Sequence, residues 1–297
     1  MKFDVSTIVA GKFFSVYGMS YIGAPRSNTA MFVSKKVEHL IEALDCVSEC
    51  LVFAETSCNV SEQLSKKHAF CFTDTPQLDF ARFATKFAQE RFYKEKALNF
   101  NLTSDGFYLS EDSIIGENAY IEPGCFIGPD VKIGKNAKIF AGTVIKHSSI
   151  GNDFIANENS VIGSFGFTMT EDDSKNKIRI PTLGNVIIGN NVEVGAHNNI
   201  SCGSCGDTII GNNVKLDSLV HVGHDVQLRD NVEVTAGVTI GGFVILEQGT
   251  YVGISSVLKN RITIGACSFI GMGACVTKSF EAQSALAGNP ARKIIRN

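Results

Sequence analysis

The sequence has no tryptophan, only 6 prolines among 297 residues, and no run of about 18 apolar residues. The absence of such a run predicts that the chain does not insert into a membrane. With 44% hydrophobic residues, 19% charged residues and 28 glycines, the composition excludes a disordered chain, which would have fewer aliphatic residues and more charge and proline. The length fits two domains or one large domain.

Neither sign of charge dominates, since 27 Lys and Arg face 30 Asp and Glu for a net charge of −3. We therefore expect no nucleic acid or anionic membrane as a partner. The 9 cysteines are odd in number and scattered, which favours reduced thiols in a reducing compartment over a disulfide framework. Asp4 and Lys12 interrupt the apolar core that a signal peptide would need. These observations predict a cytoplasmic protein.

A six-residue period dominates the second half of the chain. From Ile210 to Val276 every sixth residue is aliphatic, and the position four residues later is small or β-branched. The same period runs from Ile115 to Ile145 and resumes at Ile188. It matches neither a helix nor a long simple strand, and it is typical of a solenoid of short strands joined by tight turns.

We therefore predict a mainly β fold, a parallel β-helix of triangular cross-section in which three hexads make one coil of roughly 18 residues. Neighbouring coils would stack about 4.8 Å apart. Glycine follows many of the inward aliphatic residues, where a sharp corner favours a residue without Cβ. The period breaks between Ile162 and Ile187, so residues 163–186 are expected to protrude as a loop, and such loops often bind ligands.

Residues before about 105 contain no hexads, which predicts a separate small α/β domain. Apolar spacing predicts amphipathic helices over 32–47 and 78–97, and short buried strands over 49–55 and 68–74. The predicted organisation is an α/β domain over 1–105, a β-helix over 106–280 and a short tail over 281–297.

The [LIV]-G-x4 hexads resemble the left-handed β-helix of the hexapeptide-repeat acyltransferases. Within them, residues 178–226, which end in VHVGHDV, resemble the UDP-3-O-acylglucosamine N-acyltransferases of lipid A synthesis. The segments AMFVSKK and TDTPQLDFARFATKF resemble the nucleotide-recognising domain of those enzymes. The resemblance implies a homotrimer with active sites between neighbouring solenoids, a thioester acyl donor, and an amino sugar attached to a nucleotide. It implies no tightly bound cofactor.

The chain also departs from that pattern. The uridine-contacting F-L-x-N-P-K-Y segment reads FVSKKVE here, and the second histidine of the family falls on Arg261. The residues after Val276 have no long helical pattern, so we do not expect them to form the long C-terminal helices of that family. The C-terminal AGNPARKI instead resembles transferases that use short acyl-CoA donors, and HVGHD resembles the His-Asp/Glu pair of nucleotide-sugar N-acetyltransferases. We therefore favour an N-acyltransferase for a nucleotide-linked amino sugar in lipopolysaccharide or surface-glycan synthesis, with acyl-CoA or acyl carrier protein as donor.

Acyl transfer from a thioester to an amine needs a base for the attacking nitrogen and a donor to the tetrahedral oxyanion. His224 is the predicted base, because its hexad places it at a corner and imidazole suits proton transfer near neutral pH. Asp225 or Asp217 would orient its ring. One coil later, Gly242 would stack on His224 and offer its backbone N–H to the oxyanion, where the resemblance also places the family's oxyanion amide.

The remaining candidates are binding residues. Each of them could instead have a purely structural role, as a solvated surface group, a turn cap or a residue that packs a loop. The acyl donor is expected to meet Asn260, Arg261, Lys278 and Arg292 along or near the same corner. The acceptor is expected to meet His221, Phe165, Phe167, His197, Asn198, Phe32 and Lys35.

No metal site is predicted. Cys202 and Cys205 form a CxxC, but a structural zinc site needs a second pair at suitable spacing. The three-histidine site of β-helical carbonic anhydrases does not fit the relation among His197, His221 and His224. Three alternatives to the favoured function stay open: a true lipid A UDP-3-O-(3-hydroxyacyl)glucosamine N-acyltransferase, an O-acyltransferase, and an inert scaffold that binds a sugar nucleotide.

Overall fold

The computed structural model describes residues 2–294 and divides into two compact units. The N-terminal unit comprises the chain up to Lys96 together with Phe167–Leu183 and Ser204–Gly206. The solenoid unit comprises Ala97–Gly166, Gly184–Gly203 and the chain from Asp207 onward. Most of the segment expected to protrude therefore groups with the N-terminal unit. Residues 295–297 of the expected tail lie outside the described residues.

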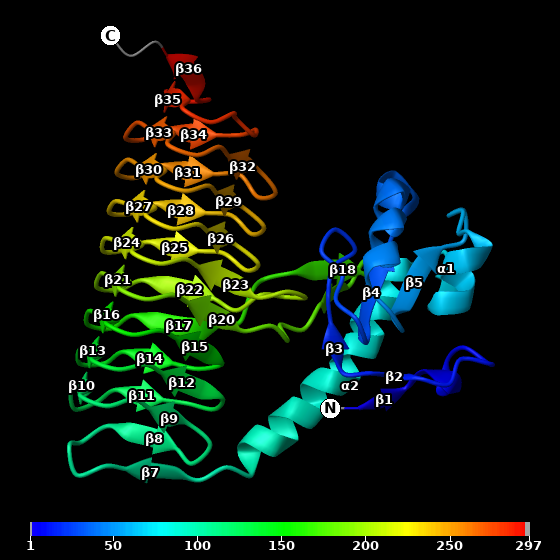
Figure 1. Cartoon of the computed structure of the whole chain (residues 1–297), viewed down its shortest axis with the longest axis horizontal. Helices are drawn as coiled ribbons and strands as arrows, with labels where there is room; N and C mark the ends of the chain where they lie inside the picture. The colour runs from blue at the N-terminus through cyan, green and yellow to red at the C-terminus, as the bar shows by residue number, and fades with distance from the viewer. Residues whose placement is uncertain (1, 295–297) are drawn as a thin grey trace. The chain divides into compact units, whose positions relative to one another are not determined.

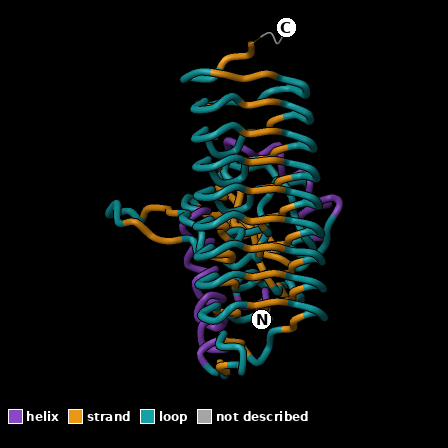
Figure 2. Tube along the Cα trace, turned by 90° about the vertical axis from the view of Figure 1, so that its left-hand side faces the viewer, coloured by secondary structure: helices purple, strands orange, loops and turns teal. Residues whose placement is uncertain are grey.

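The solenoid unit is a stack of coils with three sheets (Figure 1), whose strands pair in parallel except for the terminal strands β7 (Phe100–Leu102) and β36 (Arg292–Ile294), which pair antiparallel. In Figure 2 each coil alternates short strands with turns. The first sheet contains β7 (Phe100–Leu102), β8 (Tyr108–Ser110), β11 (Phe126–Ile127), β14 (Val144–Ile145), β17 (Val161–Ser164), β22 (Asn199–Ser201), β25 (His221–Val222), β28 (Thr239–Ile240), β31 (Val257–Leu258) and β34 (Cys275–Val276). The second contains β9 (Ile114–Ile115), β12 (Val131–Ile133), β15 (Ser148–Ile150), β20 (Val186–Ile188), β23 (Thr208–Ile210), β26 (Gln227–Leu228), β29 (Ile245–Leu246) and β32 (Thr263–Ile264). The third contains β10 (Tyr120–Ile121), β13 (Lys138–Ile139), β16 (Ile155–Ala156), β21 (Glu193–Val194), β24 (Lys215–Leu216), β27 (Glu233–Val234), β30 (Tyr251–Val252), β33 (Phe269–Ile270), β35 (Ala285–Ala287) and β36 (Arg292–Ile294).

The register of these sheets confirms the predicted coil. Val222 pairs with Ile240 and Ile240 with Leu258, a step of 18 residues each time. The step from Asn199 to His221 is 22 residues, because the short segment around Ser204–Gly206 is inserted there. Each coil has three corners, which we number by the sheets they join: the first corner leads from the first sheet to the second, the second corner to the third sheet, and the third corner back to the first.

Two side chains of each hexad point into the solenoid and form one continuous core. Val226 and Leu228 are typical, since both are fully buried. Burying a side chain of this size contributes roughly 1.5–3 kcal/mol, and the stack repeats that contribution in every hexad. The rigid core fixes the corners, where side chains point outward.

The glycines that follow the inward aliphatic residues are needed for close approach between coils. A Cβ on Gly223 would lie 2.8 Å from the backbone nitrogen of Gly242, and one on Gly241 would lie 2.7 Å from that of Asn260. The left-handed backbone conformation occurs two residues later, at positions such as Asp225 with φ 59°. The corner glycines predicted from the sequence are therefore explained by sterics between coils rather than by positive φ.

The N-terminal unit has a four-stranded parallel sheet and one long helix. Its aromatic core joins α2 to the sheet, with Phe53 against Phe83 at 5.5 Å between ring centroids. The predicted strands at 49–55 and 68–74 and the helix at 78–97 are confirmed. The elements are β1 (Phe3–Asp4), a 3₁₀ turn (Val5–Thr7), β2 (Ser15–Val16), β3 (Gly18–Met19), β4 (Thr29–Val33), a 3₁₀ segment (Lys35–Cys46), β5 (Leu51–Glu55), α1 (Glu62–Lys67), β6 (Ala69–Thr73), α2 (Pro76–Lys96), β18 (Met169–Glu171) and β19 (Lys177–Arg179).

The prediction of one amphipathic helix over 32–47 is wrong. Phe32 and Val33 end strand β4, and the following segment is 3₁₀-helical with a non-helical residue at Val37. The helical spacing of the apolar residues is confirmed within Lys35–Cys46, where Ile41 and Leu44 are buried. Phe32 and Val33 are also apolar and lie just before this helical segment, so the apolar pattern of the helix continues into the strand.

A buried histidine forms hydrogen bonds with two other segments of this unit. His68 is fully buried, its Nδ1 accepts the Cys50 N–H at 3.1 Å, and its Nε2 therefore donates to the Leu44 carbonyl, also at 3.1 Å. Burial lowers its pKa below the usual 6.5. The neutral ring is thus the form that the folded unit accommodates.

We expect the N-terminal unit to lose stability as the pH falls below about 6.5, because the unfolded chain then takes up a proton that the folded chain excludes. The stabilising contribution is complete above that pH and decreases as the pH falls toward the lowered pKa. Hydrogen exchange of β5 peptides at pH 7.5 and pH 5.5 measures it. His68→Gln, which keeps a donor and an acceptor, should reduce the difference, whereas His197→Gln at an exposed corner should not. An undiminished difference in His68→Gln would contradict this assignment.

Candidate active site

The first corner after β25 brings together the predicted base and one of its two predicted carboxylates. His224 Nδ1 lies 2.9 Å from Asp225 Oδ2. The Asp225 side chain is 2% exposed and that of His224 is 16% exposed. An ionised carboxylate only accepts hydrogen bonds, so Nδ1 carries the proton and Nε2 has the basic lone pair. This is the arrangement of a general base with an orienting acid.

Gly242 lies directly above the imidazole, as the coil spacing predicts. A Cβ built on Gly242 would be 2.7 Å from both Nε2 and Cε1 of His224. Within residues 2–294, the Gly242 backbone N–H has no hydrogen-bond acceptor. A ring nitrogen and a backbone donor therefore lie close together, an arrangement that suits an acyl carbonyl.

Two residues that the sequence analysis did not single out enclose the ring. A Cβ on Gly166, at the start of the inserted loop, would lie 2.8 Å from His224 Cβ. Phe243 meets the ring edge-on at 5.2 Å between centroids. The coil step that selected Gly242 from His224 also selects Phe243 from Asp225, so this second residue could have been found in the sequence. Gly166 could not, because its loop breaks the period.

The predicted donor-binding residues continue the first corner. The Arg261 guanidinium lies 4.1 Å from the Phe243 ring centroid, a cation–π contact. Asn260, Arg261 and Lys278 are exposed. They form a polar column above Gly242, with the Lys278 ammonium 5.4 Å from the Phe280 ring. Arg292 is exposed on β36 rather than in this column, and its guanidinium donates to the Ala291 carbonyl at 3.2 Å.

His221 lies on the outer surface of the first sheet, three residues before His224. Its Nδ1 is 3.1 Å from the Asn199 side-chain nitrogen. Loss of hydration and the neighbouring His224 lower the pKa of His221 below 6.5. A neutral His221 that accepts at Nδ1 presents an N–H donor at Nε2, which suits contact with an acceptor hydroxyl.

Three predicted residues lie away from the first corner. Asp217 and His197 are exposed at the third corner, where the chain enters the first sheet, so neither orients His224. Of the two carboxylates, Asp225 is therefore the one that contacts the His224 ring. Asn198 is 2% exposed and its Oδ1 accepts the Val220 N–H at 2.6 Å. It points into the solenoid because its hexad position is an inward one, and it is not a surface contact.

The two loop phenylalanines are exposed but belong to different units. Phe165, which is 62% exposed, lies in the solenoid unit with its ring 6.5 Å from that of His147 and 5.4 Å from the Lys146 ammonium. Phe167, which is 75% exposed, lies in the N-terminal unit beside Arg179. Both remain candidates for contact with a ligand.

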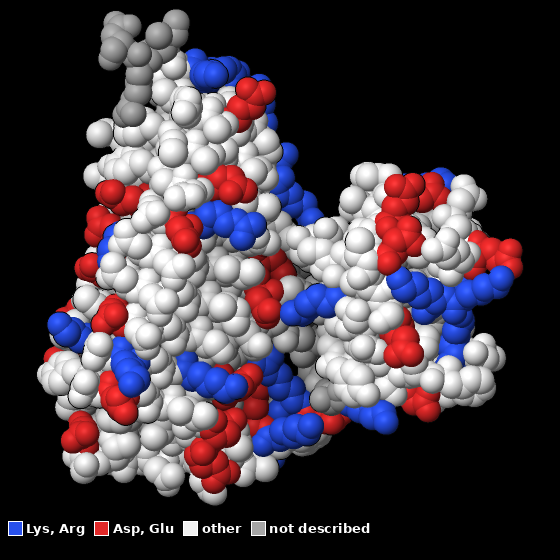
Figure 3. Space-filling model, in the orientation of Figure 1, with Lys and Arg blue, Asp and Glu red and all other residues white. Residues whose placement is uncertain are grey.

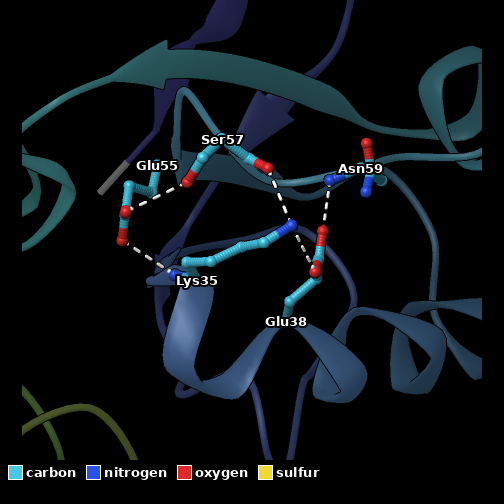
Figure 4. A network of polar contacts seen from close by, with 5 residues as sticks. All are labelled: Lys35, Glu38, Glu55, Ser57 and Asn59. Atoms are coloured by element: carbon cyan, nitrogen blue, oxygen red, sulfur yellow. Dashed lines mark hydrogen bonds and ion pairs between the residues drawn. The ribbon is translucent and has the colours of Figure 1, made fainter.

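In the N-terminal unit, Phe32 and Lys35 contact other residues of the same unit. The Phe32 ring packs 5.2 Å from that of Phe80. The Lys35 ammonium binds Glu38 at 2.7 Å and the Ser57 carbonyl at 2.9 Å (Figure 4). The Lys35 N–H binds Glu55, and the Asn59 N–H binds Glu38 and lowers its pKa. The ammonium thus has an ion-pair partner within the unit, and its contact with an acceptor stays a prediction.

The charge distribution agrees with the sequence. On the face of the solenoid shown in Figure 3, basic and acidic side chains are interspersed rather than gathered into one patch.

No group of three or more His, Cys, Asp or Glu suited to a metal ion occurs within residues 2–294. The helices in that part of the chain are also too short or too polar to span a bilayer.

Two segments of the chain, residues 112–147 and 207–242, match the model of a family described as bacterial transferase hexapeptide (six repeats). Both matched segments lie in the solenoid unit. The second matched segment contains His224, Asp225 and Gly242. The catalytic candidates therefore lie within the hexapeptide repeats themselves.

Two curated relatives of this chain have the same name. The chain is 32% identical over 156 residues to a UDP-3-O-acylglucosamine N-acyltransferase of Methylorubrum extorquens, covering 52% of this chain and 44% of that protein. A protein of the same name from a Caulobacter species is 34% identical over 153 residues, covering 52% and 45%. The matches thus span less than half of each relative. The expected resemblance to this group is confirmed.

Solved structures support the fold. LpxA, a UDP-N-acetylglucosamine acyltransferase from Bacteroides fragilis, superposes with a TM-score of 0.57 at 25% identity, over 65% of this chain and 73% of that one. LpxA from Acinetobacter baumannii gives 0.56 at 21% identity, over 65% and 74%. The predicted left-handed hexapeptide β-helix is confirmed.

Proposed function

We propose that this chain is an N-acyltransferase that moves an acyl group from a thioester to the amine of a nucleotide-linked amino sugar. The observation that carries the proposal is the His224–Asp225 pair facing the Gly242 backbone N–H at one corner of the solenoid. The names of the curated relatives support an amine acceptor on a nucleotide sugar.

The residues fit the steps of this reaction. As the sugar amine attacks the thioester carbonyl carbon, His224 Nε2 takes the proton that leaves the nitrogen. The carbonyl oxygen becomes an anion, and the Gly242 N–H donates to it. When the C–S bond breaks, the electron pair leaves with sulfur, and the protonated His224 can return its proton to the thiolate. The products are an amide and a free thiol.

The partners and organisation follow from the same proposal. Residues 1–105 would recognise the nucleotide sugar, residues 106–280 would carry out catalysis, and the tail over 281–297 would lie near the donor. The donor would be acyl-CoA or acyl carrier protein. We further propose a homotrimer, as the resemblance implies. We also propose a cytoplasmic location, because the 9 cysteines are odd in number and scattered along the chain.

Product analysis tests the proposal. The protein is incubated with a panel of acyl-CoA and acyl carrier protein donors and with UDP- and dTDP-linked amino sugars, and thiol release and product mass are measured. We expect one thiol for each acyl group added, and a product that resists mild alkali because it is an amide. An alkali-labile product would indicate an O-acyltransferase. No turnover across the panel would favour an inert sugar-nucleotide scaffold.

Arg261 gives a separate prediction about the donor. Its guanidinium is exposed and held over Phe243, where it can meet a phosphate of the donor's pantetheine arm or CoA nucleotide. Arg261→Gln should raise KM for the acyl donor about tenfold, as expected for a lost charge-assisted contact of roughly 1.5 kcal/mol, with kcat within about twofold. Arg229→Gln, which lies at the second corner, is the control. An unchanged donor KM in Arg261→Gln would exclude this contact.

A further inference from the structure

The backbone turn that holds Asp225 differs from most of the turns at its corner. At three first-corner positions with positive φ, the N–H donates to a carbonyl of the coil below, whereas the Asp130 N–H donates to the Asp112 carboxylate at 3.2 Å. His147 donates to Pro129 at 2.9 Å, Phe243 to His224 at 2.9 Å and Arg261 to Gly242 at 3.0 Å. Asp225, with φ 59°, instead donates to a side chain, the Thr208 hydroxyl, at 3.0 Å.

The chain insertion explains the exception. Between the coils that contain Asn199 and His221 the register step is 22 residues rather than 18. The extra residues lie at the first corner, immediately before β23, and they take the backbone away from its usual stacking position. Thr208 is the first residue of β23. Its hydroxyl supplies the acceptor that a carbonyl supplies for His147, Phe243 and Arg261.

Packing alone does not explain a threonine here. Thr208 is fully buried and pairs with Val186, which is fully buried, and the inward residue of the next coil is Val226, also fully buried. A valine would fill this position with the same shape and no buried hydroxyl. The hydroxyl is nevertheless satisfied, because it donates to the Ser201 carbonyl at 2.7 Å and so must accept from Asp225.

We propose that Thr208 is a positioning residue that sets the His224–Asp225 pair for proton transfer. The relay runs from the Asp225 N–H through the Thr208 hydroxyl to the Ser201 carbonyl. It fixes the left-handed turn at Asp225, and that turn aims the carboxylate at His224 Nδ1. The consequence is that His224 keeps its proton on Nδ1 and its lone pair on Nε2, toward Gly242. The effect on turnover rests on the proposed function, whereas the effect on the imidazole does not.

Three variants separate the effect of the Thr208 hydroxyl from the effect of side-chain packing. Thr208→Val keeps shape and removes the relay, and Thr208→Ser keeps the relay and removes a methyl group. Thr250→Val is the matched control, since Thr250 is also fully buried but its hydroxyl donates to the Glu247 carbonyl at the second corner. Circular dichroism and thermal unfolding establish that each variant folds.

The first readout is the ¹⁵N spectrum of selectively labelled histidine, with His224 assigned from the His224→Gln spectrum. Wild type, Thr208→Ser and Thr250→Val should show His224 protonated at Nδ1, and Thr208→Val should show a mixture of tautomers. The second readout is kinetic. Thr208→Val should lower kcat between about 10- and 100-fold with KM for both substrates within about threefold, because a small misplacement of a catalytic group costs up to about 10²-fold.

Rescue by serine separates positioning from packing. We expect Thr208→Ser to retain kcat within about threefold. A Thr208→Val protein that folds and keeps the wild-type His224 tautomer overturns the proposal, whether or not any substrate is turned over. If no donor and acceptor pair is turned over by the wild type, the proposed function fails, and the tautomer measurement alone decides the role of Thr208.

Discussion

His224→Ala is expected to lower kcat about 10³-fold, within the range of about 10²- to 10⁴-fold that a positioned base contributes. The variant loses the imidazole that lies against Gly242, while Asp225 is left buried with no imidazole partner. KM for the acyl donor should change little, because the donor column lies above this coil. Thiol release measures both constants.

The control for this variant is His197→Ala, which removes an exposed histidine at the third corner. It should keep kcat within about twofold. Because the buried Asp225 carboxylate could destabilise the coil in His224→Ala, His224→Gln provides a second variant that retains a hydrogen-bond donor. Turnover near the wild-type rate in both His224 variants would refute the assignment of the base.

Gly242→Ala is expected to lower kcat by about 10²- to 10³-fold, the usual cost of losing an oxyanion donor. The new methyl carbon would lie 2.7 Å from His224 Nε2 and Cε1, closer than nonbonded atoms approach. His224 cannot yield freely, because Asp225 holds its Nδ1 and Gly166 lies against its Cβ. The methyl group therefore displaces the base and fills the space proposed for the acyl carbonyl.

The matched substitution is Gly18→Ala, where a methyl group would meet nothing within 4 Å. It should leave kcat and the melting temperature near their wild-type values. A crystal structure of Gly242→Ala should show the His224 ring rotated or shifted. If Gly242→Ala keeps full activity with an unmoved ring, the space above His224 is not where the acyl group reacts.

The solenoid could be predicted from the sequence because its physical cause is local and repeated. Each hexad places the same two inward side chains, so the register of Val222 with Ile240 follows from counting residues. The same counting placed Gly242 over His224. It failed where the chain is inserted between coils, and the contacts of Gly166 and Thr208 with the His224–Asp225 pair lie there.

Two other predictions failed for different reasons. Sequence proximity suggested Asp217 as a partner of His224, but one hexad corresponds to one corner of the triangle, so a residue one hexad earlier faces another direction. The apolar spacing over 32–47 predicts one helix, because the strand residues Phe32 and Val33 are apolar like the helical residues that follow them. The ion pair between Lys35 and Glu38 could not be predicted, because only their three-residue spacing in the sequence points to it.

The central claim is that the acyl group reacts at the first corner, between His224 and Gly242. A crystal structure of the protein with a thioether analogue of acyl-CoA, which retains the carbonyl group but cannot transfer it, tests this claim most directly. We predict the analogue's carbonyl oxygen about 2.7–3.1 Å from the Gly242 nitrogen, with its carbonyl carbon beside His224 Nε2. An analogue bound with its carbonyl at another corner, or away from the solenoid, would contradict the account.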